Sequence, residues 1–345
     1  MEKVEPEEEP VLQAPKRRNF YLSPDQYPSR LKDSTKILFC GDVMFDWGVK
    51  DSINELGYES LVEDLVPVFS QVDYRVINLE TPVLKKSLLS EKRKAYVFSG
   101  TPEDLILLSQ LDIDLAGFAN NHSMDFGFSG VKETRELLLD NGISIVGIGE
   151  NELEASKPHR FTIRENQFAI YSKTEIADRT HRSTKTLPGV SFLEAPLAPP
   201  KPKEHSILSI HWGTEYLPEP TPSQQKRAEE ISRLGYDAIV GHHPHIPQGI
   251  QLIRRTVVVY SLGNCIFGSR NVYLNHNLIA ILHYKQDKLL ALELVPIFGK
   301  FQYERHKFRP LEEKAVDFLE EVQYMSRKLG TDIVIDNNRA YLFLE

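Results

Sequence analysis

Five short apolar runs in this chain of 345 residues each end in a small cluster of polar residues. A short apolar run that ends in this way is typical of a buried β-strand. In an open α/β sheet, sites form outside the carboxyl ends of the strands, so clusters far apart in sequence meet there. The pattern therefore predicts an α/β fold with one polar site at the edge of its sheet. The five clusters are Gly41-Asp42, Asn78-Leu79-Glu80, Asn120-Asn121-His122, His211-Trp212-Gly213 and Gly241-His242-His243-Pro244-His245.

Helical segments alternate with these strand-like runs. Apolar residues at helical spacing predict helices over residues 102–111, 129–141, 222–234 and 311–329. Residues 249–253 and 257–260 are predicted to pair as one hairpin, and residues 278–284 and 289–296 as another pair of strands. Residues 178–203 lack periodicity and are interpreted as a long surface loop, with a lid as the alternative. Strands alternating with helices are typical of an α/β layer architecture.

The chain is predicted to divide into three parts. Residues 1–34 are rich in Glu and Pro without a hydrophobic period, which indicates a flexible tail. Residues 35–300 contain the alternating strands and helices and form the main domain. Residues 301–345 are predicted to be an extension of strand and helix that packs on the same domain.

The charge balance limits the partners that this chain can have. A formal net charge of -8 argues against nucleic acid, because phosphate contacts need clustered Lys and Arg. No apolar stretch approaches the roughly 20 residues that cross a bilayer. The acidic N-terminus does not resemble a secretory signal. We therefore expect a cytoplasmic protein with no transmembrane segment.

The two cysteines, Cys40 and Cys265, each lie in or beside an apolar run. We interpret both as buried free thiols rather than as a disulfide or as ligands, because a buried cysteine behaves as a small apolar side chain. Two cysteines in a chain of this length do not indicate a disulfide scaffold.

The polar clusters bring together two carboxylates, two amides and several imidazoles. Carboxylate and imidazole are the ligands expected for Zn, Mn, Fe or Ni. Taken singly the clusters are weak signals, because an Asp at a strand end more often caps a helix and a lone His more often lies in the core. Three imidazoles in four positions at His242, His243 and His245 have little structural purpose, and they favour metal binding or catalysis.

In combination and order, these stretches resemble the CapA/PgsA family of poly-γ-glutamate capsule biosynthesis proteins, a branch of the calcineurin-like metallophosphoesterase superfamily. The matching stretches span about residues 37–267 and are ILFCGDVM, VINLETPV, GFANNHSMDFG, SIHWGTEY, VGHHPHIPQGI and VYSLGNCIF. The resemblance implies a four-layer α/β/β/α sandwich of the metallophosphoesterase type.

The resemblance also implies a site for one or two divalent metal ions, namely Mn, Zn or Fe. Within it, His122 resembles the acid that protonates the leaving group, and His242 is a second candidate catalytic residue. The implied metal ligands are Asp42, Glu80 at the bridging position, Asn121, His211, His243 and His245.

Two departures from the superfamily pattern affect this site. Methionine at position 44 replaces a histidine ligand, and methionine is a poor ligand for such metals. One ion therefore lacks a ligand unless Asp46, His242 or Asn78 substitutes. The bridging residue is Glu80 in place of the usual Asp. Other residues beside the motifs could orient ligands or cap loops (Asp125 and Asn264), or could line a pocket or pack in the core (Trp47, Phe126, Trp212 and Tyr216).

Hydrolysis is the first function that this reading predicts. A metal-activated water would act on a phosphoester or on a γ-glutamyl or other peptide-type bond, in a small-molecule, peptide or polyglutamate substrate. The alternatives are an accessory role in poly-γ-glutamate synthesis, metal-dependent acid/base chemistry such as peptide epimerisation, and a binding module without activity. The hydrolase prediction depends partly on analogy, because one fold supports many chemistries.

Overall fold

A computed structural model describes residues 27–85, 88–90, 94–194, 197–268, 275–299 and 307–344. The chain divides into two units, residues 1–32 and 33–345. In the first unit the described part contains the short helix α1 (Tyr27–Arg30), while residues 1–26 of the predicted tail lie outside the described residues. Residues 301–306 of the predicted extension lie outside them as well. The three-part division stays a prediction.

The larger sheet of the second unit has ten strands, and β1 (Thr35–Val43) lies near its middle. On one side β1 pairs in parallel with β2, and β3 and β4 follow; on the other side it pairs antiparallel with β14. The short strand β13 pairs in parallel with the end of β1. The remaining strands are β2 (Tyr74–Leu79), β3 (Leu115–Gly117), β4 (Ser144–Val146), β13 (Asn264–Ile266), β14 (His276–Lys285), β15 (Lys288–Phe298), β16 (Arg309–Pro310), β17 (Val334–Asp336) and β18 (Arg339–Phe343).

A second sheet has six strands in the order β11-β12-β10-β9-β7-β6. The predicted hairpin over residues 249–260 is confirmed as β11 and β12, which pair antiparallel. The pairing of residues 278–296 is confirmed as β14 and β15 in the larger sheet. The strands of the second sheet are β6 (His159–Ile163), β7 (Asn166–Thr174), β9 (Glu204–His211), β10 (Ala238–His242), β11 (Ile250–Ile253) and β12 (Thr256–Val259).

The interpretation of residues 178–203 as a surface loop holds for part of the described segment, which has many exposed residues and little regular structure, and is wrong for its buried part. The segment contains a short 3-10 helix, η3 (Arg179–His181), and strand β8 (Gly189–Val190), which pairs with β5 (Ile148–Gly149). Ser191 is buried, and its carbonyl oxygen accepts from the Thr174 backbone N–H at 2.9 Å. These long-range hydrogen bonds order the segment although its sequence has no period.

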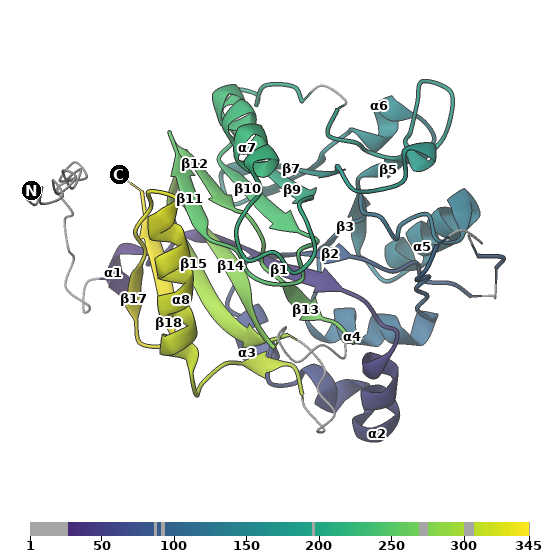
Figure 1. Ribbon diagram of the computed structural model, residues 1–345, viewed down its shortest axis with the longest axis horizontal. Helices are drawn as coiled ribbons and strands as arrows, with labels where there is room; N and C mark the ends of the chain where they lie inside the picture. Colours follow the sequence, from purple (N-terminus) through teal and green to yellow (C-terminus); the bar gives the residue numbers. More distant parts are fainter. Residues whose placement is uncertain are drawn as a thin grey trace, which may run out of the picture. The chain divides into compact units, whose positions relative to one another are not determined.

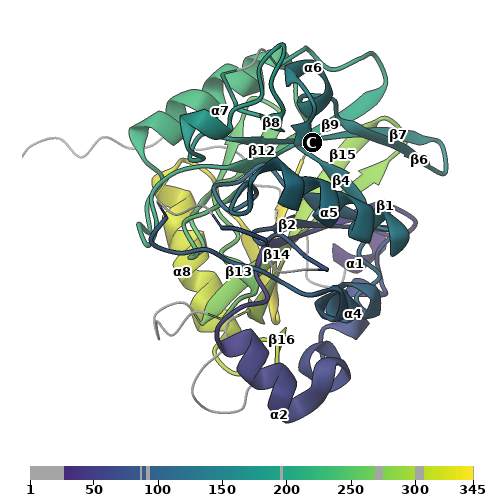
Figure 2. The same ribbon diagram turned by 90° about the vertical axis from the view of Figure 1, so that its right-hand side faces the viewer.

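Each face of the larger sheet has its own core. Ile37 and Phe39 of β1 pack with residues of the second sheet and of helix α8 (Ala315–Lys328), while Leu38 and Cys40 pack under helices. This alternation follows from the two-residue period of a strand. The helices on that other face are α2 (Gly48–Val62), α3 (Val66–Phe69), α4 (Leu105–Gln110), which follows the 3-10 helix η2 (Pro102–Asp104), and α5 (Gly127–Asp140). Figure 2 shows α2 and α7 (Pro222–Leu234) on opposite sides of the two sheets.

Helix α7 (Pro222–Leu234) covers the outer face of the second sheet through Ala228 and Ile231. The side chain of Thr221 caps its start, and Gly235 ends it in the left-handed conformation. Helix α6 (Glu152–Ala155) is short and precedes β6. In Figure 1, α8 lies beside β11 and β15. A mixed α/β architecture with two main sheets is thus confirmed. In the described residues, no helix is long and apolar enough to span a membrane.

The interpretation of the cysteines as free thiols is wrong. Cys40 and Cys265 form a disulfide with a Cα–Cα distance of 5.5 Å, and neither side chain is exposed. The parallel pairing of β13 with β1 brings together two residues that are separated by 225 positions. The apolar sequence around each cysteine suits a buried disulfide as well as a buried thiol, so that pattern alone could not distinguish the two.

Candidate metal centre

The polar clusters meet where the parallel strands of both sheets end. Asp42 at the end of β1 is in register with Asn78 of β2 and with Asn264 of β13. His242 at the end of β10 is in register with His211 of β9. A hydrogen bond joins the two sheets here. The His243 backbone N–H donates to Asp42 Oδ2 at 3.1 Å.

Two groups of three side chains within this edge could each hold a metal ion. The first, which we call the Asp42 position, consists of Asp42, Glu80 and His245; the second, the His211 position, consists of Glu80, His211 and His243. Within each group the ligand atoms lie within 4.8 Å of one another, and all five residues are buried. Because Glu80 belongs to both groups, the arrangement is compatible with a pair of divalent ions.

Unsatisfied polar atoms support this interpretation. Neither carboxylate oxygen of Glu80 has a hydrogen-bond partner among the described residues, and the same is true of His243 Nδ1. A buried polar group without a partner costs about 1–3 kcal/mol, so native proteins rarely leave several at one place. Coordination of a cation would satisfy these atoms, and the residues present therefore fit a divalent metal.

The pKa values of these residues also support a metal site. Burial, followed by the charge of Asp42, raises the pKa of Glu80 to about 8. Burial lowers the pKa of His211 and of His243 well below the usual value, so both rings are neutral, which is the form that binds metals. Burial opposes protonation of His245, but Glu80 and Asp42 raise its pKa to about 9. The five candidate ligands are closely spaced carboxylates and imidazoles, and a divalent cation would balance the negative charge of the carboxylates.

Amide side chains orient several of these residues. Asn264 Oδ1 lies 3.0 Å from His245 Nδ1, and Asn78 Nδ2 donates to Asp42 Oδ1 at 2.8 Å. Asn121 Oδ1 lies 2.7 Å from His211 Nε2, which places this amide oxygen at the His211 position. Asn264 thus contacts the candidate ligand His245 directly.

The backbone that presents two of the imidazoles is strained. His243 has a φ of 96° and His245 a φ of 58°, so both adopt the left-handed region. For residues other than glycine this conformation costs about 1–2 kcal/mol each. Pro244 lies between them. Such strain is concentrated at functional sites, where the surrounding structure holds it in place.

His122 lies at the edge of the cluster with one ring nitrogen already engaged. Its Nδ1 is 2.9 Å from Asp125 Oδ2, and the ring lies 4.2 Å from that of Phe98. Asp125 also accepts from the Phe98 backbone N–H at 2.9 Å and forms an ion pair with Lys94. The dyad fixes the ring and leaves Nε2 as the nitrogen that can exchange a proton.

His242, the second predicted catalytic residue, differs from His122 in its burial and in its hydrogen bonds. Its side chain is almost completely buried, and Nδ1 lies 3.5 Å from Asp42 Oδ1. Neither ring nitrogen has a hydrogen-bond partner in the described part of the chain, and His242 belongs to neither group of candidate ligands.

Met44 is packed as an apolar side chain. It is fully buried in a cluster with Phe98 and Phe267, and its sulfur accepts from the Asp46 backbone N–H at 2.8 Å. The carboxylate of Asp46 forms an ion pair with Lys50 at 3.1 Å, and Asp46 belongs to no group of candidate ligands among the described residues. Neither residue therefore supplies the ligand that the superfamily pattern has at position 44.

Sequence reasoning missed one acidic residue at this edge. The carboxylate of Glu215 forms a third group with His243 and His245, again within 4.8 Å, and Glu215 is exposed. It belongs to the quoted stretch SIHWGTEY, but an exposed glutamate in a loop has no sequence signal that separates it from a solvated one.

Aromatic side chains border the cluster. Trp47, which is 38% exposed, makes edge contacts with Tyr96 at 5.6 Å and with Phe98 at 4.8 Å. Tyr216, which is 47% exposed, lies 6.0 Å from the His245 ring. Trp212 instead belongs to the core and is fully buried. The two exposed rings could therefore contact a substrate at the edge of the site.

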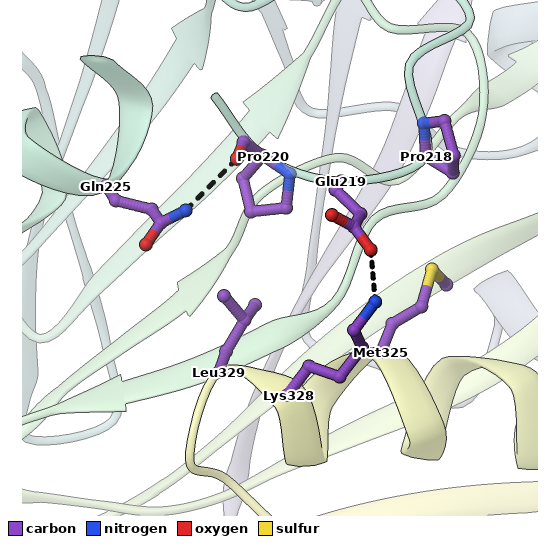
Figure 3. Close-up of a pocket in the computed structure, with 7 residues that line it drawn as sticks. All are labelled: Pro218, Glu219, Pro220, Gln225, Met325, Lys328 and Leu329. Carbon is purple, nitrogen blue, oxygen red and sulfur yellow. Dashed lines mark hydrogen bonds and ion pairs between the residues drawn. The ribbon is translucent and has the colours of Figure 1, made fainter. Parts of the chain in front are cut away.

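A separate pocket of about 190 Å³ lies between the loop before α7 and helix α8, as Figure 3 shows. It contains the ion pair between Lys328 and Glu219 and the hydrogen bond from Gln225 Nε2 to the Pro220 carbonyl oxygen. None of its lining residues belongs to the candidate ligand groups.

Comparison with known proteins identifies relatives over most of the chain. The family described as "Bacterial capsule synthesis protein PGA_cap" matches residues 36–269. The chain is 28% identical over 266 residues to the PGA biosynthesis protein CapA of Bacillus subtilis (strain 168), covering 75% of this chain and 70% of that protein. It is 26% identical over 281 residues to the capsule biosynthesis protein CapA of Bacillus anthracis, covering 78% and 68%. A probable polyglutamine synthesis accessory protein of Mycobacterium tuberculosis is 26% identical over 211 residues, covering 56% and 55%.

Proposed function

Because this chain belongs to the PGA_cap family of bacterial capsule synthesis proteins, we propose that it is a metal-dependent hydrolase that cleaves a γ-glutamyl or other peptide-type bond. A phosphoester is the alternative substrate bond. The observation that carries the proposal is the pair of buried ligand groups that share Glu80, next to the His122–Asp125 dyad. The proposal includes the four-layer sandwich of metallophosphoesterases, because helices cover the outer face of each main sheet.

The proposed ligands divide between the two positions. Asp42 and His245 would hold one ion, His211, His243 and the amide oxygen of Asn121 the other, and Glu80 would bridge them. Divalent ions bound there would lower the pKa of a coordinated water and draw charge from an oxygen of the substrate.

Side chains of the protein would supply the leaving-group proton and contact the substrate. Asp125 accepts the hydrogen bond from His122 Nδ1 and so fixes the tautomer and the direction of the ring. The Nε2 proton can then pass to the leaving group, as expected for a general acid. Phe98 covers one side of the imidazole and limits its contact with water. Trp47 and Tyr216 offer exposed aromatic faces on which the substrate could pack.

An accessory role in polymer synthesis is a second candidate. It is favoured by the names of the relatives, one of which is called a probable polyglutamine synthesis accessory protein. In this case the site would bind the polymer or its precursors without turnover. The ligand groups would then serve binding, and the His122–Asp125 dyad would be dispensable.

Metal content and hydrolysis test the proposal together. Elemental analysis of protein purified without chelator should find about two divalent ions per chain, as a bridged pair requires. His243→Ala should lose at least one of them, whereas His276→Ala, outside the candidate groups, should not. The loaded protein should cleave γ-glutamyl peptides or phosphodiesters. Metal retained without turnover would favour the accessory role, and no metal even after loading with Mn²⁺ or Zn²⁺ would overturn the metal centre.

A further inference from the structure

The two candidate metal positions are unequal in the number of ligands. The His211 position has three titratable ligands and the amide oxygen of Asn121, which lies 2.7 Å from His211 Nε2. The Asp42 position has only its three titratable residues. Met44 does not complete it, because its sulfur accepts a backbone hydrogen bond inside an apolar cluster. The Asp42 position therefore has one protein ligand fewer than the His211 position.

Glu215 is a further carboxylate at this edge of the sheets. Its ligand oxygen lies within 4.8 Å of the ligand nitrogens of His243 and His245. No hydrogen bond or ion pair joins the Glu215 side chain to another residue of the described chain, so the carboxylate is available. Beside it, His243 Nδ1 is buried and has no hydrogen-bond partner among the described residues, which is an independent sign of a missing cation.

The loop that carries Glu215 is tied to the segment that carries the two histidines. Before Glu215, Trp212 is buried and donates from Nε1 to the Tyr260 carbonyl oxygen at 2.9 Å. Directly after it, the Tyr216 backbone N–H donates to the Pro244 carbonyl oxygen at 2.9 Å. Pro244 lies between the two imidazoles, so the loop keeps Glu215 close to both.

We propose that Glu215 is a further ligand of this centre and binds an ion together with His243 and His245. The inference rests on the metal centre of the proposed function but not on hydrolysis. Glu215 would add a carboxylate oxygen from a different loop beside one imidazole of each position. Carboxylate oxygen suits Mn²⁺, which makes this ion a suitable probe.

Mn²⁺ binding followed by electron paramagnetic resonance tests this assignment without any activity assay. The wild-type protein should bind Mn²⁺ in two classes. Glu215→Gln keeps the size of the side chain but removes its charge, and it should weaken one class by at least about tenfold, the loss typical even of a residue that only orients a ligand. The other class should stay within about twofold. Glu215→Asp, which keeps the charge, should have an intermediate effect.

Glu219→Gln is the matched control, because Glu219 is an acidic residue of the same loop that pairs with Lys328 away from the site. It should leave both classes unchanged. Circular dichroism and thermal unfolding should show that all variants are folded. Two unchanged classes in folded Glu215→Gln would overturn the assignment of Glu215 alone. Failure of the wild-type protein to bind Mn²⁺ or Zn²⁺ would instead overturn the metal centre itself.

Discussion

Replacing Lys173 with methionine should make the stability of the protein less dependent on pH above neutrality. Lys173 lies in β7 and is 1% exposed. Its Nζ lies 3.2 Å from Ser191 Oγ and 3.3 Å from the Phe192 carbonyl oxygen, and no carboxylate in the described chain forms an ion pair with it. The ammonium group is therefore buried with neutral acceptors only.

The size of the effect follows from the pKa. Burial lowers the pKa of Lys173 to about 8, while Glu152 opposes this shift and Arg182 adds to it. In the unfolded chain the pKa is about 10.4. Between these values the unfolded state binds more protons than the folded state, so the contribution of Lys173 to stability rises with pH. From pH 7 to pH 10 the rise is about 2–3 kcal/mol.

The assay is urea unfolding of both proteins at several pH values between 7 and 10. We compare the free energy of unfolding of Lys173→Met with that of the wild type. The value for the variant minus the value for the wild type should fall by about 2–3 kcal/mol from pH 7 to pH 10. The hydrogen bonds that the variant loses add a term that does not change with pH. Lys226→Met, at an exposed position of α7, is the matched control for the loss of a cation. A difference that stays constant with pH would refute the reasoning, because Lys173 would then titrate alike in both states.

Three further outcomes are expected. Cys40→Ser opens the disulfide and should lower the free energy of unfolding by about 2–5 kcal/mol; detection of two reactive thiols in unreduced, unfolded wild-type protein would contradict the disulfide itself. Gly241→Ala should destabilise by about 2–5 kcal/mol in urea unfolding, because the added Cβ would lie 1.9 Å from the Tyr260 carbonyl oxygen. Asp125→Asn should reduce kcat by about 100-fold or more, as expected for an impaired general acid, with unchanged metal content by elemental analysis. Loss of metal in this variant would mean that Asp125 acts on the ligands rather than on His122.

Local signals explain what could be predicted from the sequence. The bounds of α7 follow from Thr221, Pro222 and Gly235, which act within one turn of the helix ends, and the structure confirms them. The convergence of the polar clusters also follows from the order of strands and helices. By contrast, α2 carries a non-helical glycine at Gly57, with a φ of 78°, which breaks its period. No helix was predicted there.

Long-range pairing explains what could not be predicted. The disulfide depends on β13 returning to the end of β1, and nothing near Cys40 or Cys265 indicates that partner. The position of Glu215 depends on a hydrogen bond between Tyr216 and Pro244, which lie on two different loops. The order of the segment around Ser191 depends on β7 in the same way. In each case the decisive contact is absent from the local sequence pattern.

The central place of β1 has a consequence for the chain during its synthesis. Among the described strands β1 is the first to leave the ribosome, yet its partners β13 and β14 are made only after most of the domain. At about 5–20 residues per second, the 225 residues between the two cysteines take roughly 10–45 seconds to translate. During that time one edge of β1 has no partner, and an unpaired strand edge invites pairing with other chains. A nascent chain of this protein should therefore depend on chaperones until β14 has emerged, and fragments that end before His276 should aggregate.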